Sequence, residues 1–469
     1  MNCFEEDVPM PLSPMADYFS SSLINVFVMA VVESEIPIDE SKVLPLLKNK
    51  LIPMCSRFSS IMVTVKNGKK VWKQVDVNLK DHVKIPKFTS NNRTFKLYDE
   101  CFDEYMEKIG MEQIREDKPL WEVHLFKYPT SKCEGTFIFK LHHALGDGFS
   151  FMTTFLSIVE SADNPSIPVK FPSSKSSTST NGMPKQLSQT ASVMFKSAVD
   201  FGWSLLKNSL IPDQQTPLRS GHEDVGFRPM RIVNVSLSLD SIKEVKNKLK
   251  VSVNDVLVGA IFLGIELYMK AKNHRSRSGE STALVLLNTR KIRAYIPAKE
   301  MHATNSTAPW GNRFHFMHVP LPMLSHNKKL NPLEFVLDAK KNINRQRNSL
   351  AVPMTGVLLR FLNQIKGPQA ATQYVYKIMN NASLSISHMV GPSEKVTLAN
   401  HPIKGIYFMS VGLSQSITVT ITSYMGYLRV GFGVEEGFID EYQLKSCFQT
   451  SLQMILEAAK KITYLKSIL

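Results

Sequence analysis

The spacing of apolar and polar positions predicts alternating strands and helices at the start of the chain. The run INVFVMAVVES at 24–34 is apolar and rich in β-branched residues, which predicts a strand. A helical pattern follows at 39–53, beginning at an Asp-Glu pair and ending near a proline. A second apolar helix is predicted at 149–162, directly after the turn sequence ALGDG.

The segment TFIFKLHH at 136–143 predicts another strand, because apolar side chains recur at every second position. This alternation places His143 on the same face as three apolar residues and His142 on the opposite face. The two neighbouring histidines should therefore lie in different surroundings.

The later part of the chain carries both kinds of pattern. The apolar run at 256–264 is too short to span a bilayer and predicts a buried core helix, with good capping residues from Ser252 onward. Two alternating segments within 416–435 flank Met425-Gly426, which predicts a hairpin. A last helix is expected from about Asp440. The class is mixed α/β.

The residues at 163–189 are dense in Ser, Thr and Pro, a composition typical of a linker. An amphipathic helix is predicted directly after them at 190–211, with a tryptophan between lysines opposite a wide apolar stripe. Such a helix suits a membrane interface, and equally it could pack on its own domain. We therefore divide the chain into lobes at 1–162 and 230–469, joined by a linker region at 163–229.

Composition and charge narrow the classes of function. The 469 residues are 43% hydrophobic and 21% charged, which fits a folded globular protein. The net charge of +15 is uneven: residues 1–162 hold 19 basic against 22 acidic side chains, and residues 163–469 hold 37 against 19. This excess predicts an anionic partner for the later part, or only a soluble basic surface.

The five cysteines are far apart and form no C-x-x-C pair, which indicates neither a disulfide framework nor a zinc site. A reducing compartment is expected. The first residues are acidic and do not resemble a secretory signal, so the four N-x-S/T sequons are not expected to be glycosylated.

The sequence HHALGDG at 142–148 is the strongest candidate for chemistry. A neutral imidazole on the apolar side of a strand end stays unprotonated near neutral pH, so His143 is a candidate general base. Asp147 should hold an arginine or a backbone donor rather than react; simple turn chemistry is the alternative. No metal-binding spacing and no G-x-S-x-G elbow is present, so we expect a substrate hydroxyl or amine to attack directly.

Several short segments, in this order and rough spacing, resemble the plant-type wax ester synthase/diacylglycerol acyltransferases. They are PLSPMADYF, PLWEVHLF, HHALGDG, SVNDVLVGA, LNTR (Leu287 to Arg290), WGNRF (Trp310 to Phe314), SISHMVGP and YFMSVG. The resemblance extends over nearly the whole chain outside the linker.

The resemblance implies a chloramphenicol-acetyltransferase-like fold, α/β of the α+β kind, with two similar lobes, mainly antiparallel or mixed sheets and an active-site channel between them. It implies that His143 takes the proton from a long-chain alcohol or diacylglycerol as the hydroxyl attacks acyl-CoA. Asp147 matches a structural aspartate, expected to pair with Arg290. Asn254 matches a position thought to stabilise the oxyanion, although a plain N-cap is a serious alternative. His142, Gly148 and Asp255 are expected to support the site.

The same resemblance bears on partners and location. No metal or redox cofactor is expected, and acyl-CoA is a substrate. The basic excess would meet CoA phosphates or anionic headgroups, with candidate clusters at Lys340, Lys341, Arg345 and Arg347 and at 270–277. A membrane surface is expected as a partner, namely the cytosolic face of the endoplasmic reticulum or the plasma membrane.

Two other classes of protein stay open at this point. Membership of the BAHD alcohol acyltransferases is one, although the DFGW element at 200–203 lies mid-chain here and reads as a coincidence. A lipid-binding protein that kept the fold without activity is the other. Nucleic-acid binding has only the charge in its favour, because no aromatic residues are interleaved with a basic patch.

Overall fold

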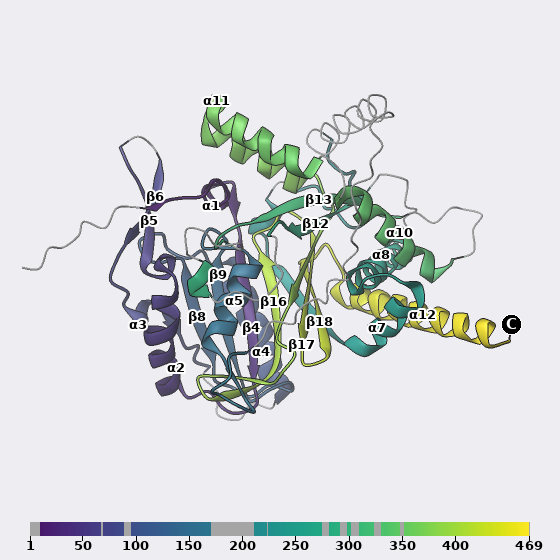
Figure 1. Ribbon diagram of the computed structural model, residues 1–469, viewed down its shortest axis with the longest axis horizontal. Helices are drawn as coiled ribbons and strands as arrows, with labels where there is room; N and C mark the ends of the chain where they lie inside the picture. The colour runs from purple at the N-terminus through teal and green to yellow at the C-terminus, as the bar shows by residue number, and fades with distance from the viewer. Residues whose placement is uncertain are drawn as a thin grey trace, which may run out of the picture.

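Two large sheets form the body of the protein (Figure 1). The computed structural model describes residues 10–66, 69–88, 95–169, 211–222, 224–273, 281–290, 298–301, 309–322, 330–347 and 351–468. Within them the order of elements is mixed α/β, as the alternating sequence patterns predict.

The first sheet has seven strands in the order β10-β15-β16-β4-β9-β8-β7. Their bounds are β4 Phe27–Ser34, β7 Val83–Lys84, β8 Trp121–Phe126, β9 Gly135–His142, β10 Glu160–Ser161, β15 Val396–Leu398 and β16 His401–Val411. The predicted strands at 24–34 and 136–143 become the antiparallel neighbours β4 and β9, with Ala30 opposite Phe139. Alternate side chains of both strands therefore share one face of the sheet.

Helices cover both faces of this sheet. The helix α5 (Gly148–Ile158) lies over the face that carries Phe139, and α4 (Phe95–Met111) lies over the other face, where Gly110 approaches Met29. The predicted helix at 39–53 is α2 (Glu40–Leu46), capped by Asp39 and continued by a π-helical turn and a 3-10 turn to Met54.

Small elements surround the first sheet. They are β1 Met10–Pro11, α1 Pro14–Phe19, β2 Ser20–Ser21, β3 Ile24–Asn25, β5 Ser60–Thr64, β6 Lys70–Gln74 and α3 Leu79–His82. The strands β1, β6 and β5 form a three-stranded sheet of their own.

The second sheet has six strands in the order β11-β18-β17-β14-β12-β13. Their bounds are β11 Met230–Ser238, β12 Thr282–Asn288, β13 Phe314–Pro320, β14 Leu384–Val390, β17 Ile417–Tyr424 and β18 Tyr427–Glu435. The predicted hairpin is confirmed: β17 and β18 pair around Met425 and Gly426, both with positive φ. Positive φ at both central residues is the requirement of a tight type I′ turn.

Helices pack beside this second sheet, to the right in Figure 1. They are α7 Leu239–Leu249, α8 Val253–Ala271, α10 Pro332–Arg347 and α12 Glu441–Ile468. The short α9 Ala298–Met301 contacts α5, and the second half of α11 (Ala351–Asn380) packs against β12 and β13. The run 256–264 lies within α8 and is buried throughout, which confirms the predicted core helix. None of the described helices alone has the length and apolar composition to cross a bilayer; only α7 and α8 taken together, bent by 100°, reach that criterion.

The chain crosses between the two sheets late in the sequence. β15 and β16 belong to the region 230–469 but pair within the first sheet, where β16 runs antiparallel to β4. Thr420 Oγ1 of β17 donates to the Phe408 carbonyl oxygen of β16 over 2.5 Å, and Arg429 pairs with Glu33 at 2.7 Å. The predicted division at 1–162 and 230–469 did not include this crossing: β15 and β16 come from the later part of the chain and complete the first sheet. The predicted helix at 190–211 lies outside the described residues except for its last position.

Candidate active site

One side chain holds His143 through two hydrogen bonds. His143 Nδ1 lies 2.9 Å from Asn312 Oδ1, and Asn312 Nδ2 donates to the His143 carbonyl oxygen over 2.8 Å. A backbone carbonyl can only accept, so the amide orientation is fixed and Asn312 Oδ1 must accept the proton on Nδ1. The neutral imidazole therefore presents Nε2 as its free proton acceptor.

Aromatic rings surround the His143 imidazole. Phe19, the last residue of α1, stacks on it with ring centres 4.5 Å apart. Phe314 and Phe151 approach at 5.5 and 6.5 Å. Burial among these rings lowers the pKa of His143 below 6.5, while Asp147 and the bond to Asn312 oppose the shift. The side chain is thus a desolvated, unprotonated base at neutral pH.

An apolar cavity lies next to two neighbours of the His143 imidazole. Its empty volume is about 610 Å³, including the part open to solvent, and it lies between α5 and the face of β4, β9 and β16. Leu141, two residues before His143 on the same face of the strand, lines it, and so does Phe151, whose ring faces the imidazole. Met389 of β14 and Thr422 of β17 close it from the second sheet. A long apolar chain fits such a lining.

Asp147 is the N-cap of α5 and accepts four hydrogen bonds. Its Oδ1 accepts from the Ser150 backbone N–H at 3.0 Å, and its Oδ2 accepts from the Arg313 backbone N–H at 2.8 Å. The Arg290 guanidinium supplies the other two, at 2.7 and 3.1 Å. Both partners of this ion pair are buried. The expected pairing of Asp147 with Arg290 is confirmed, and the carboxylate has a structural position rather than a place beside the imidazole.

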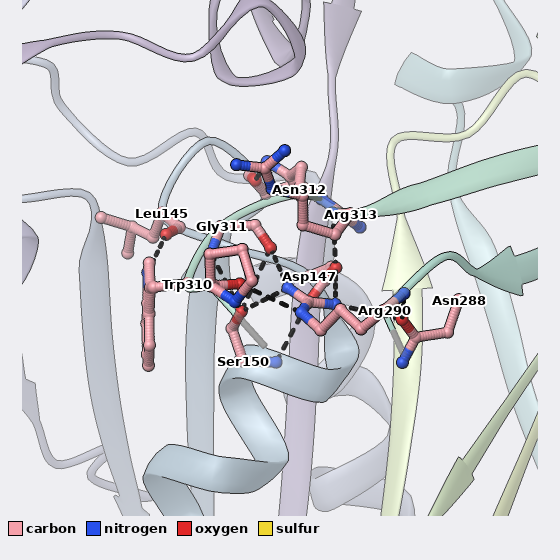
Figure 2. A network of polar contacts seen from close by, with 11 residues as sticks. Leu145, Asp147, Ser150, Asn288, Arg290, Trp310, Gly311, Asn312 and Arg313 are labelled. Atoms are coloured by element: carbon pink, nitrogen blue, oxygen red, sulfur yellow. Dashed lines mark hydrogen bonds and ion pairs between the residues drawn. The ribbon is translucent and has the colours of Figure 1, made fainter. Parts of the chain in front are cut away.

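Arg290 ties the motif loop to the segment 309–313, as Figure 2 shows. Besides Asp147, it donates to Ser150 Oγ at 3.1 Å and to the carbonyl oxygens of Pro309 and Gly311. Gly311 has φ +110°, a conformation that residues with a side chain rarely adopt. Ser150 Oγ also donates to the Gly311 carbonyl at 3.1 Å. The segment is therefore fixed one residue away from Asn312.

Leu145 of the HHALGDG motif also holds the segment 309–313, through its backbone carbonyl oxygen. This oxygen accepts from Trp310 Nε1 at 2.8 Å (Figure 2). The same oxygen accepts from Arg57 Nη1 at 2.9 Å. Both donors are buried. Trp310 and Arg290 thus fix the segment before Asn312 at two separate points.

His142 points away from the cavity, as the strand alternation predicts. Its Nδ1 accepts the Ala144 backbone N–H at 3.0 Å, so Nε2 carries the proton and donates to Asn25 Oδ1 at 3.0 Å. Complete burial, with a smaller contribution from His143, lowers the pKa of His142 to about 3. This histidine supports the loop and has no free nitrogen for proton transfer.

The two glycines of the motif differ in how closely they are packed. A Cβ on Gly146 would lie 3.0 Å from Ser150 Cβ and 3.5 Å from Trp310 Nε1, which is crowded. On Gly148, the first residue of α5, it would meet only the Met389 sulfur at 3.5 Å. Gly146 is therefore the position where the close approach of Ser150, in the first turn of α5, leaves little room for a side chain.

The start of α8 is capped as its sequence predicts. Ser252 Oγ accepts from the Asp255 backbone N–H at 3.1 Å, and Asp255 Oδ2 accepts from the Ser252 backbone N–H at 2.8 Å. Asp255 is thus part of a capping box. Asn254 lies between them in the first turn, and within the described residues no contact joins it to His143. Its role as an oxyanion donor stays a prediction.

Within the described residues, no contact joins the predicted basic side chains to His143. Lys340 on α10 donates to the Lys250 carbonyl oxygen, which closes the end of α7. Lys341, Arg345 and Arg347 are exposed on α10, which packs on α8 and β13. Of the cluster 270–277, only the first four residues are described. A role for these side chains in binding CoA stays a prediction. The described residues include no group of three or more metal-binding side chains.

Comparison with known proteins connects this geometry to a family. Residues 48–257 match the wax ester synthase/diacylglycerol acyltransferase catalytic domain, and residues 310–456 match the WS/DGAT C-terminal domain. The chain belongs to the wax ester synthase/diacylglycerol acyltransferase family. Among its relatives in Arabidopsis thaliana, wax ester synthase/diacylglycerol acyltransferase 4 is 27% identical, covering 97% of this chain and 92% of the relative. Wax ester synthase/diacylglycerol acyltransferase 6 from the same plant is 28% identical, and the match covers 97% of this chain and 95% of that relative.

Solved structures confirm the fold expected for a WS/DGAT chain. The wax ester synthase/diacylglycerol acyltransferase from Marinobacter aquaeolei VT8 superimposes with a TM-score of 0.60 at 16% identity, covering 96% of this chain and all of that one. The starter condensation domain of rhizomide synthetase, solved as an arginine-to-alanine mutant in complex with C8-CoA, superimposes with a TM-score of 0.58 at 11% identity. The match covers 97% of this chain and 95% of that domain. The chloramphenicol-acetyltransferase-like fold is therefore shown. The matches to the two WS/DGAT domain models, and not the fold, set the BAHD alternative aside.

Sequence reasoning did not assign the WS/DGAT residue that holds the histidine. Asn312 lies within WGNRF, a segment noted for its resemblance but given no role. Ser150 and Phe19 were likewise unassigned, although each touches the Asp147 network or the imidazole directly. The only available signal was the resemblance of WGNRF and LNTR to family segments, because neither sequence shows by itself that the segment contacts the HHALGDG loop.

Proposed function

We propose that this protein transfers a long-chain acyl group from acyl-CoA to the hydroxyl of a long-chain alcohol or of diacylglycerol. The observation that carries the proposal is the free Nε2 of His143, set in an aromatic enclosure beside an apolar cavity. Wax esters and triacylglycerol are the respective products. Membership of the family supports an acyl transfer of this general kind.

The reaction needs one base and an activated acyl donor. Nε2 of His143 takes the proton from the acceptor hydroxyl as its oxygen attacks the thioester carbonyl. The tetrahedral intermediate collapses, the carbon–sulfur bond breaks, and the leaving thiolate takes the proton back from the imidazolium. No acyl-enzyme forms in this scheme. A positioned general base contributes about 10²–10⁴-fold to such a step.

Asn312 makes this base effective. Because its amide holds the proton on Nδ1, it selects the tautomer with a lone pair on Nε2, and it also stabilises the imidazolium as that ion forms. The Asp147–Arg290 pair acts one step further away, by fixing the segment that carries Asn312. Asn254 remains our candidate for an oxyanion donor, worth about 10²–10³-fold if it reaches the intermediate.

The cavity is the proposed site of an apolar chain. The sheet lines one side of it with Val28 and Ala30 of β4 and Phe139 of β9, and α5 lines the other side. An acyl chain lying there would bring its thioester end toward His143, since Leu141 and Phe151 join the cavity to the imidazole. Burial of each methylene group contributes about 0.8 kcal/mol, which favours long chains.

We further propose action at the cytosolic face of the endoplasmic reticulum, with no resident cofactor. The lipid nature of both substrates supports that site. Cell fractionation with marker proteins tests the location directly. A distribution that follows only the soluble markers would contradict it.

Product analysis in a host unable to make storage lipid tests the function. We expect wax esters when fatty alcohol is added, triacylglycerol without it, or both. The His143→Ala variant, expressed at an equal level, is the control and should give neither. Neutral lipid absent from cells that accumulate the folded wild-type protein would overturn the proposal.

A further inference from the structure

The helix α11 carries an exposed apolar stripe on its first half. Val357, Phe361 and Ile365, four residues apart in turn, have exposed fractions of 53%, 56% and 64%. This spacing places them on one side of a helix. Gly367, with φ +81°, and Pro368 then bend the chain and end this first half. Figure 1 shows α11 running across the top of the molecule, beyond both sheets.

The opposite side of the same helix packs close to the active site. Leu359 and Leu362 pack against the small apolar cluster that contains Tyr18 and Phe19. Phe19 in turn stacks on the His143 imidazole. One turn of α11 therefore contacts the wall of the catalytic site with one side and exposes large apolar side chains on the other.

The charge of this region has a single sign. Between Asp338 and Glu394 the chain has no acidic residue. It has seven basic residues there, namely Lys340, Lys341, Arg345, Arg347, Arg360, Lys366 and Lys377. All but Lys340 are exposed, and α10, which carries four of them, contacts α11. Two of these cations, Arg360 and Lys366, lie on the same half of α11 as the apolar stripe, and this half has no carboxylate.

We propose that the outer face of α11 docks on a bilayer surface that carries anionic lipid headgroups. Val357, Phe361 and Ile365 enter the acyl-chain boundary, while Arg360 and Lys366 meet the headgroups. An apolar stripe with basic borders is the pattern of a helix lying in a membrane interface. A nucleic-acid partner would use the cations but leave the central apolar stripe without a role.

This docking places the lipid surface one helix away from His143. An acceptor dissolved in the bilayer would reach the base past α1 and α11 without crossing water; this last step rests on the proposed acyl transfer, whereas the docking itself does not. The helix predicted at 190–211 is a separate candidate for membrane contact, and the experiment distinguishes the two.

Flotation of the purified full-length chain with vesicles tests the docking. One set of vesicles contains phosphatidylcholine alone, and the other contains added phosphatidylserine. The test variant is Val357→Ser/Phe361→Ser/Ile365→Ser, and the matched control is Tyr427→Ser/Tyr442→Ser, which removes two exposed aromatic rings elsewhere. For the charge, Arg360→Gln/Lys366→Gln is compared with Lys460→Gln/Lys461→Gln on α12.

We expect the wild-type chain to float with the anionic vesicles and the triple variant to lose about tenfold or more of its partition coefficient. The control variants should keep wild-type partition. Arg360→Gln/Lys366→Gln should lose most of the preference for phosphatidylserine. Because the altered side chains lie outside the catalytic site, transfer to a detergent-dispersed alcohol should persist in the triple variant.

Three results would overturn the proposal. The triple variant could bind vesicles as the wild type does, or deletion of 190–210 could abolish binding while the triple substitution leaves it unchanged. Sedimentation without lipid could instead show a dimer that the triple variant loses, which would make the stripe an interface between two copies. Loss of vesicle binding with retained transfer, by contrast, leaves the proposed acyltransferase function intact.

Discussion

Asn312 and His143 hold each other through two hydrogen bonds of opposite direction, although 169 positions separate them in the chain. The amide of Asn312 fixes the tautomer of the imidazole, and the backbone of His143 fixes the amide. This reciprocal pair spans the boundary between the motif loop after β9 and the segment before β13. The base therefore exists only when both halves of the chain are assembled.

Substitution of Asn312 should change both the rate and the pH dependence. Asn312→Ala removes the acceptor for Nδ1–H, so we expect kcat to fall by about 10²-fold, with little change in KM for acyl-CoA. The hydrogen bond that His143 Nδ1–H donates to Asn312 Oδ1 raises the pKa of His143, so its loss should move the acid limb of the pH–rate profile to lower pH. Asn312→Asp places a negative charge there and should move the limb to higher pH. A purely structural role would lower the amount of folded enzyme and leave the limb in place.

The wild-type enzyme should lose activity only in acid. Burial lowers the pKa of His143 from its ordinary value, so the imidazole is mainly unprotonated at neutral pH and becomes protonated as the pH falls through that lowered pKa. We expect kcat/KM to be flat from neutral to alkaline pH and to decline with unit slope only in acid. The measurement is initial rate against pH with a fatty alcohol and acyl-CoA. A decline that begins well above neutral pH would contradict the assigned base.

Removal of Arg290 should unfold the site. Its partner Asp147 is buried, and a buried ion pair left with one charge costs about 3–5 kcal/mol in the free energy of unfolding. Arg290→Met should therefore lower stability by that amount and abolish activity, because the segment carrying Asn312 is released. Arg231→Met removes a half-exposed arginine that pairs with Glu107 and Glu436, and it should cost less than about 1 kcal/mol. Urea unfolding of the two variants provides the comparison; equal losses would count against the account.

A larger side chain on the sheet side of the cavity should shorten the preferred acyl chain. Ala30 lines the cavity beside Phe139, and Ala30→Leu would occupy part of its length. We expect kcat/KM for palmitoyl-CoA relative to octanoyl-CoA to fall by about 10–200-fold. Ala30→Ser changes the volume little and should keep the wild-type ratio. An unchanged ratio in Ala30→Leu would place the acyl chain elsewhere.

Local patterns predicted the secondary elements that depend on neighbouring residues alone. The strands at 24–34 and 136–143, the buried helix containing 256–264 and the hairpin at Met425 all follow from periodicity, capping and turn chemistry. The orientation of His142 and His143 follows in the same way, since strand alternation needs no knowledge of the partner strand. These elements fix where the base lies.

The parts that depend on distant pairing were not visible in the sequence. β16 reads as an apolar strand, but nothing in its pattern says that it joins β4 rather than a neighbour in the second sheet. Asn312 resembles an ordinary loop residue, because its role depends on a carbonyl oxygen 169 positions earlier. The stripe on α11 looks like any amphipathic pattern until packing shows which side is left exposed.

The rate of acyl transfer by His143→Ala tests the central claim most directly. The assay measures CoA thiol release and ester formation together, with purified enzyme, long-chain acyl-CoA and fatty alcohol, while circular dichroism and the unfolding midpoint verify the fold. With Nε2 removed, the account predicts a loss of about 10²–10⁴-fold in kcat, and a smaller loss for His142→Ala. A folded His143→Ala enzyme that keeps the wild-type rate would contradict it.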